Sequence, residues 1–259
     1  MVLTHSDGAS TFRTSYCQLA ALTRSPPRVE KFPLFVLVVP VLLLSMVAHE
    51  YAHGYAALKQ GDDTAQSLGR LTWNPIKHID PWLTVIMPLV SFFVAGIAFG
   101  GAKPVPVNPR LYRNYRRGDI IVSLAGVVTN LVLAAALVPV VIGLGLAARA
   151  VPALGDSVAL LQIMFLYGIT INLVLAAFNL IPLPPLDGSH VVKHFLPFAA
   201  AVAYQRIARY GLLIVFLLVG MGRSVLNAWM APAFWLNDLA LRVASPYVEL
   251  GRWASLVSP

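Results

Sequence analysis

Long uncharged stretches, separated by short polar ones, dominate this chain. A first apolar helix is predicted from Phe32 to Leu58, and it carries no charge as far as Ala48. At 1.5 Å per residue it is about 40 Å long, which is enough to cross a hydrocarbon core of ~30 Å. Residues 120–148 and 157–186 are two further uncharged runs joined by a short loop, and they predict an antiparallel pair of membrane helices. The pattern is typical of an all-α polytopic membrane protein.

Composition and charge support a membrane location and argue against nucleic-acid binding. Of the 259 residues, 58% are hydrophobic and only 12% are charged, against about 25% charged in soluble proteins. The net charge of +8 comes from lysines and arginines in the loops between apolar runs, as expected of a cytoplasmic membrane face. The single cysteine, Cys17, excludes an intramolecular disulfide and a four-cysteine zinc site. The strongest cytoplasmic signal is a group of four arginines: Arg110, Arg113, Arg116 and Arg117.

The two ends of the chain are more polar than its middle. Residues 1–30 contain no hydrophobic stretch of the kind that a cleaved signal peptide carries, so we expect a flexible polar tail. Residues 223–259 carry tryptophans among scattered charges, which predicts a segment at the membrane interface. Residues 31–222 between them form the membrane-embedded domain. Asp62 and Asp63, just after the first helix, are expected to lie in a solvated turn.

The sequence H-E-x-x-H lies near the end of the first apolar helix. His49 and His53 are four residues apart, so a helix presents both imidazoles to one point, where they can bind a metal ion. Glu50 falls beside that point and can take a proton from a metal-bound water. Two histidines and a glutamate inside a membrane-length helix are costly and predict function. The alternative, that they are interior polar residues satisfied by their neighbours, is much less favoured.

A catalytic zinc ion needs three protein ligands and one open position. Asp187 is the best third ligand, because it follows the uncharged run 157–186 and three prolines in four positions that must end the helix. His190 and His194 compete for this role with their own i, i+4 spacing. No glutamate stands between them, however, so we expect a structural or interfacial role for this pair.

The fourth uncharged run, 81–102, either spans the membrane or enters it and returns. Pro88 and several glycines permit a broken, re-entrant element. If the arginine-rich loop is cytoplasmic, residues 120–148 run outward, 157–186 return, and Asp187 lies near the cytoplasm. Sharing a metal with Asp187 then requires the first helix to run inward as well. Both ends of 81–102 would be cytoplasmic, which favours the re-entrant alternative.

Three stretches together resemble the site-2 protease family of intramembrane zinc metalloproteases. They are the H-E-x-x-H sequence, A-G-x-x-x-N at Ala125–Asn130, and N-x-x-P-x-P-x-L-D-G at Asn179–Gly188. The resemblance covers about Leu34 to Phe216. Val127 stands where the family often has proline, and His190 stands where arginine is common. No PDZ domain interrupts the chain, so we do not expect substrate selection by such a domain within it.

The resemblance implies a transmembrane helix bundle that carries out regulated intramembrane proteolysis. A water molecule, activated by Glu50 on one zinc ion per chain, would attack peptide bonds within or near the transmembrane segments of single-span membrane proteins. Asn179 and Asn130 would hold the substrate or its oxyanion. Residues 102–108 would lie beside the site as an extended strand that pairs with unwound substrate. The expected location is the cell membrane, with several passes; the alternative is a non-proteolytic membrane metal-binding protein or transporter.

Overall fold

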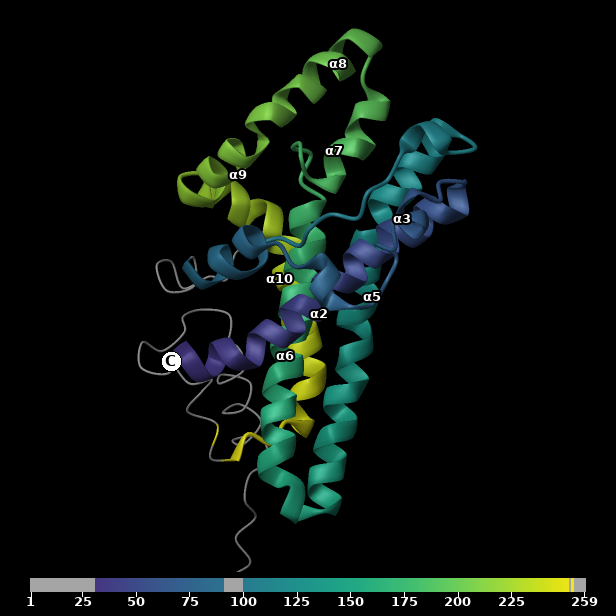
Figure 1. Cartoon of the computed structure of the whole chain (residues 1–259). Helices are drawn as coiled ribbons and strands as arrows, with labels where there is room; N and C mark the ends of the chain where they lie inside the picture. Colours follow the sequence, from purple (N-terminus) through teal and green to yellow (C-terminus); the bar gives the residue numbers. More distant parts are fainter. Residues whose placement is uncertain (1–30, 91–99, 252, 254–259) are drawn as a thin grey trace, which may run out of the picture. The chain divides into compact units, whose positions relative to one another are not determined.

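The computed structural model describes residues 31–90, 100–251 and 253, and all regular secondary structure in them is helical (Figure 1). Three helical segments are long and apolar enough to cross a membrane, and a bent pair near the C-terminal third makes up to four. The predicted all-α, multi-pass architecture is therefore confirmed. The predicted tail 1–30, with Cys17, lies outside the described residues.

The helices that carry this architecture are few, and short 3-10 or π turns connect them. The elements are α2 (Lys31–Gln60), α3 (Thr64–Ser67), η1 (Pro75–His78), η2 (Pro81–Ile86), η3 (Pro109–Leu111), α5 (Tyr115–Ala150), η4 (Pro152–Leu154), α6 (Gly155–Asn179), α7 (Asp187–Val192), η5 (Lys193–Phe195), α8 (Phe198–Arg206), η6 (Ile207–Tyr210), α9 (Gly211–Gly220), α10 (Arg223–Ala244) and η7 (Ser245–Tyr247). The three candidate spans are Pro33–Gln60, Tyr115–Ala150 and Pro152–Asn179.

The chain folds into two compact units. Of the described residues, the first contains 31–42, Ala134–Thr170, 235–251 and 253. Its interior is held by Gln162, a fully buried residue whose amide donates to the carbonyl of Val141, 2.9 Å away, on the neighbouring helix α5. A buried amide in an apolar helix pair needs such partners, because an unpaired one would be costly.

Of the described residues, the second unit contains 43–90, 100–133 and Ile171–Phe234, and all the predicted site residues fall within it. The end of α2 is tied to the arginine-rich stretch, because Arg113 N–H donates to the carbonyl of Gln60 over 2.8 Å. The end of α2 and the start of α5 therefore lie at the same level, as the predicted helix directions require. The cytoplasmic side of that level remains a prediction.

One sequence-based expectation about the turn after α2 is wrong. Asp62 is only 1% exposed, whereas a solvated turn was expected. Its carboxylate accepts hydrogen bonds from Thr64 N–H over 3.0 Å and from Asn108 N–H over 2.6 Å. Asp62 thus ties the end of α2 to the chain that precedes η3, because a buried carboxylate is stable only where donors surround it.

The two ends of the run 81–102 are hydrogen bonded to each other. Gly101 N–H donates to the carbonyl of Leu83 over 2.9 Å, and the Thr84 hydroxyl donates to the carbonyl of Gly101 over 2.7 Å. A segment whose ends meet returns to where it began, which supports the re-entrant alternative. Its middle, residues 91–99, lies outside the described residues.

After α7 the chain bends sharply. The helical pair Phe198–Tyr210 and Leu213–Gly220 is bent by 74°, so it forms either a broken span or a re-entrant loop. The start of α10 packs along α6, where the indole N–H of Trp229 donates to the carbonyl of Ala177 over 2.8 Å. That residues 223–259 lie at a membrane interface stays a prediction.

Candidate metal centre

The two histidines of the H-E-x-x-H sequence converge as their helical spacing predicts. Their Nε2 atoms lie 2.9 Å apart. Both side chains are largely enclosed, with 9% of His49 and 12% of His53 exposed. The imidazole of His53 is oriented from the other side, because its Nδ1 lies 2.7 Å from the carbonyl of Val122 on α5. With Nδ1–H donating to that carbonyl, Nε2 is unprotonated and its lone pair can bind a metal ion.

Asp187 completes the cluster from a distant part of the sequence. Its Oδ2 atom lies 3.2 Å from His49 Nε2 and 3.3 Å from His53 Nε2. Helix α6 ends at Asn179, and the proline-rich turn then places Asp187 at the first residue of α7. Gly188 permits this turn to close, because a Cβ on it would meet the carbonyl oxygen of Ile181 at 2.8 Å.

The donor set fits a zinc ion. Within residues 31–90, 100–251 and 253, this is the group of three metal-binding side chains whose ligand atoms all lie within 4.8 Å of one another. Buried Asp187 Oδ2 receives no hydrogen bond. Two nitrogen lone pairs and a carboxylate this close repel one another unless a cation lies among them.

A glycine on α5 leaves room for this cluster. A Cβ on Gly126 would lie 2.5 Å from His49 Cε1 and 2.5 Å from His53 Nε2, which is too close for any side chain. Gly126 is one helical turn beyond Val122, so the same face of α5 orients one imidazole and accommodates both. This gives a physical role to the glycine in the A-G-x-x-x-N stretch.

Glu50 lies on a neighbouring face of α2 and has a partner that sequence reasoning did not identify. Its Oε2 atom accepts a hydrogen bond from Val105 N–H over 2.8 Å. Val105 belongs to an extended stretch, residues 100–108, that crosses α2 (Figure 1). Gly54 permits this approach, since a Cβ there would meet Val105 Cγ1 at 2.9 Å. The segment 102–108, predicted to lie beside the site as an extended strand, therefore does lie next to Glu50. Its pairing with substrate stays a prediction.

The two asparagines predicted to hold substrate differ in their surroundings. Asn130 is fully buried one turn beyond Gly126, and within the described part of the chain neither atom of its amide has a hydrogen-bond partner. Asn179 is half-buried at the end of α6, and its amide donates to the carbonyl of Leu175 in the same helix over 3.0 Å. Their roles remain predictions.

A second charged cluster lies beside the first, and it includes a residue that the sequence analysis missed. Asp119, 2% exposed near the start of α5, lies 2.6 Å from Lys193 Nζ and 2.7 Å from His194 Nε2. Its other oxygen is 3.5 Å from His190 Nδ1. The available signal was an acid directly before an uncharged run, for which the basic side chains after Asp187 are natural partners. His190 and His194 thus contact this carboxylate, and the structural or interfacial role expected of them stays a prediction.

Comparison with known proteins yields several matches. Residues 144–221 match peptidase family M50. The chain is 40% identical over 193 residues to "Putative zinc metalloprotease YwhC" of Bacillus subtilis, an alignment that covers 73% of this chain and 82% of that protein. It is 30% identical over 219 residues to "Putative zinc metalloprotease Rip2" of Mycolicibacterium smegmatis, covering 84% of this chain and 79% of the relative. No solved structure matches the chain.

Proposed function

Because the chain belongs to peptidase family M50, the site-2 protease family, we propose that it is an intramembrane protease that performs regulated intramembrane proteolysis. It hydrolyses peptide bonds within or near the transmembrane segments of single-span membrane proteins. The observation that carries this proposal is the convergence of His49, His53 and Asp187 at one end of membrane-length helices, with Glu50 alongside. We assign it to the cell membrane, with the metal centre toward the cytoplasmic side.

His49, His53 and Asp187 hold one zinc ion in this proposal, which leaves the fourth position open. A bound zinc ion supplies Lewis-acid activation of water and of the scissile carbonyl. Val122 contributes by fixing the tautomer and orientation of His53, a support that typically strengthens metal binding about 10- to 100-fold. Gly126 contributes by leaving the space that the two imidazoles need.

Glu50 acts as the general base. Its carboxylate accepts a proton from the attacking water while the new C–O bond forms, and passes that proton to the peptide nitrogen as the C–N bond breaks. The hydrogen bond from Val105 N–H engages one carboxylate oxygen and holds the group in place. The other oxygen stays available to the water. A positioned base of this kind contributes typically 10²–10⁴-fold to the rate.

The extended stretch beside Glu50 is where we propose that unwound substrate pairs. Its backbone limits how the substrate can do so. The N–H groups of Lys103, Val105 and Asn108 already donate to protein oxygens, and Pro104 and Pro106 have none. A substrate strand therefore pairs mainly by donating to carbonyl oxygens of the stretch, with Val107 as the remaining N–H between residues 103 and 108. The carbonyls of Lys103 and Pro104 already accept from the guanidinium of Arg70, which leaves one lone pair on each.

Two amides complete the proposed machinery. Asn130 is a candidate donor to the substrate or its oxyanion, since its buried amide has no partner in the described residues and a buried amide is costly to leave unpaired. Asn179 serves the same purpose only if its amide leaves the carbonyl of Leu175 when substrate binds. In the alternative, a metal transporter, we would expect ligands spread along several helices, whereas the described residues offer one cluster.

Cleavage by purified protein tests the proposal. The full chain is incubated in detergent with a panel of single-span substrates, with and without a chelator, and products are resolved on gels. Glu50→Gln should retain zinc and lose at least about 100-fold in cleavage rate, whereas His49→Ala should lose both. His190→Ala is the matched control and should keep both. Chelator-resistant cleavage, or an active Glu50→Gln protein, would show that the mechanism is wrong.

A further inference from the structure

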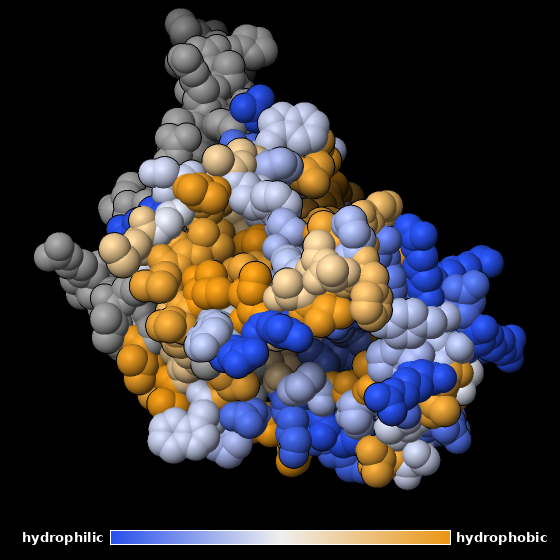
Figure 2. All heavy atoms as spheres, turned by 90° about the horizontal axis from the view of Figure 1, so that it is seen from above, coloured by the Kyte–Doolittle hydropathy of each residue, from blue (hydrophilic) through white to orange (hydrophobic). Residues whose placement is uncertain are grey.

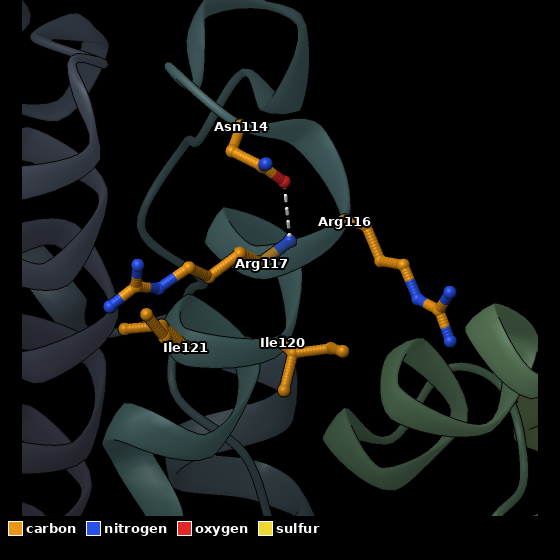
Figure 3. A pocket seen from close by; sticks show the side chains of 5 residues that line it. All are labelled: Asn114, Arg116, Arg117, Ile120 and Ile121. Carbon is orange, nitrogen blue, oxygen red and sulfur yellow. Dashed lines mark hydrogen bonds between the residues drawn. The ribbon is translucent and has the colours of Figure 1, made fainter.

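A hollow of about 430 Å³ lies on the protein surface at the start of α5 (Figure 3). Two arginines form its upper part and two isoleucines its lower part, one helical turn further on. Figure 3 shows the guanidinium groups of Arg116 and Arg117 reaching to opposite sides, with Ile120 and Ile121 below. The residues that line the hollow are Asn114, Arg116, Arg117, Ile120 and Ile121.

Among the residues that the structure describes, no ion pair neutralises the positive charge of this hollow. The ion pairs of the described residues include Arg149 but none of the arginines from 110 to 117. The guanidinium of Arg116 lies 5.7 Å from the ring centre of Phe195, which leaves its N–H groups available. Asn114 accepts from Arg117 N–H over 3.0 Å through its side-chain oxygen, so its NH₂ group can donate elsewhere. An anion with several acceptor oxygens matches this set of donors.

An apolar strip continues from the hollow along α5. Helical spacing places Ile121, Val128 and Val132 on the same face as Arg117, at steps of four, seven and four residues. Their exposed fractions are 37%, 53% and 60%. Only 22% of the most apolar part of this helix is buried in the protein, so most of it faces its surroundings. A chain of methylene groups can lie along this strip.

The hollow also lies where a membrane surface is expected. Helix α5 is a candidate span, and its arginines come just before the apolar part begins. Figure 2, which views the protein from above, shows hydrophobic and hydrophilic side chains exposed side by side on this face. The exposed apolar residues Phe195, Phe198 and Met221 belong to the second compact unit, which also contains the hollow. Such a mixed surface suits the boundary between headgroups and acyl chains.

We propose that this hollow binds an anionic phospholipid. Its phosphodiester headgroup lies beside Asn114 and between Arg116 and Arg117, whose exposed side chains turn toward it on binding. One acyl chain lies along Ile121, Val128 and Val132. The two-part surface selects the lipid. A free phosphate uses the arginines alone, and a zwitterionic lipid brings a cation to an already positive hollow. This site is separate from the proposed zinc ligands and does not depend on proteolysis.

Lipid titration of the purified full chain, followed by native mass spectrometry, tests the site. Phosphatidylglycerol and phosphatidylcholine with the same acyl chains are compared. Arg116→Gln/Arg117→Gln should weaken phosphatidylglycerol binding about 30-fold, which corresponds to about 1 kcal/mol for each arginine. The matched control Arg110→Gln/Arg113→Gln removes the same charge from the same stretch outside the hollow. It should change binding less than about threefold.

Two further measurements distinguish a lipid headgroup from free phosphate, and a specific site from diffuse electrostatic attraction. Arg116→Lys/Arg117→Lys keeps the charge and loses the planar fork, so an intermediate loss of binding is expected. Millimolar inorganic phosphate should displace little phosphatidylglycerol, because it lacks the acyl chain. If Arg116→Gln/Arg117→Gln and Arg110→Gln/Arg113→Gln weakened phosphatidylglycerol binding equally, the attraction would be diffuse and the proposal would be overturned. Full displacement by inorganic phosphate, or equal binding of both lipids by the wild type, would overturn it as well.

Discussion

Removing the carboxylate of Asp119 should weaken zinc binding at a centre that it does not touch. Asp119→Asn leaves the ammonium of Lys193 without its counter-charge, although that side chain is only 8% exposed. Breaking a buried pair in this way costs about 3–5 kcal/mol. Lys193 lies directly after α7, which begins at Asp187, so the loss falls on the element that carries the third ligand.

The expected change in zinc affinity can be estimated because Lys193 adjoins the helix that carries Asp187. If the whole loss were expressed as disorder of α7, zinc affinity would fall by about 100- to 4,000-fold. Part of it will instead lower the stability of the whole fold, so we expect a rise of at least about tenfold in the zinc Kd. Titration against a chromophoric chelator measures this Kd, and thermal unfolding measured in parallel reports the global part.

Two matched variants make the prediction specific. Glu249→Gln breaks the exposed ion pair with Arg149, whose side chains are 44% and 48% exposed, so it should cost less than about 1 kcal/mol and leave the zinc Kd unchanged. Asp119→Asn/Lys193→Met removes both buried charges and should bind zinc more tightly than Asp119→Asn alone. An Asp119→Asn protein with unaltered zinc affinity, or a double variant that binds zinc no more tightly than Asp119→Asn, would refute the reasoning.

Three other predictions follow from the site and the topology. Gly126→Ala should abolish tight zinc binding, because the new Cβ would lie 2.5 Å from ring atoms of both ligand histidines; Gly143→Ala on the same helix meets nothing within 4 Å and should bind zinc normally. Val105→Pro removes the N–H that holds the general base, so kcat should fall by about 10- to 150-fold at unchanged zinc content; an effect on KM alone would contradict this. Single cysteines at Ser67 and Asn114, in a cysteine-free background, should both be protected from an impermeant thiol reagent on intact cells, whereas labelling of position 67 alone would show that the segment between them spans.

The sequence alone was sufficient for features that depend on near neighbours in the chain. Uncharged runs of membrane length predicted the three helices that can span, and the i, i+4 spacing of His49 and His53 predicted that their imidazoles meet. Three prolines in four positions predicted that α6 ends before Asp187. Each of these follows from helix geometry or from backbone sterics over a few residues.

The contacts that hold the centre together were not predictable in this way. The partner of His53 is the carbonyl of Val122, 69 residues away, and that of Glu50 is the N–H of Val105, 55 residues away. Backbone groups are the same at every position, so no residue type marks which of them will serve. Asp62 was expected in solvent because the residues around it in the sequence do not reveal its donor. The donor that keeps it buried, Asn108 N–H, lies 46 residues further on.

Asp119 shows the same limit for side chains. An acid beside an uncharged run is compatible with a membrane surface or with a buried pair, and the local sequence is the same in both cases. The packing of α5 against the segment after Asp187 brings the carboxylate to Lys193, His190 and His194. Helical spacing and the positions of prolines therefore determined which residues could bind a metal ion. The tertiary structure decided which backbone and charged groups support them, because those groups meet only when helices distant in sequence pack together.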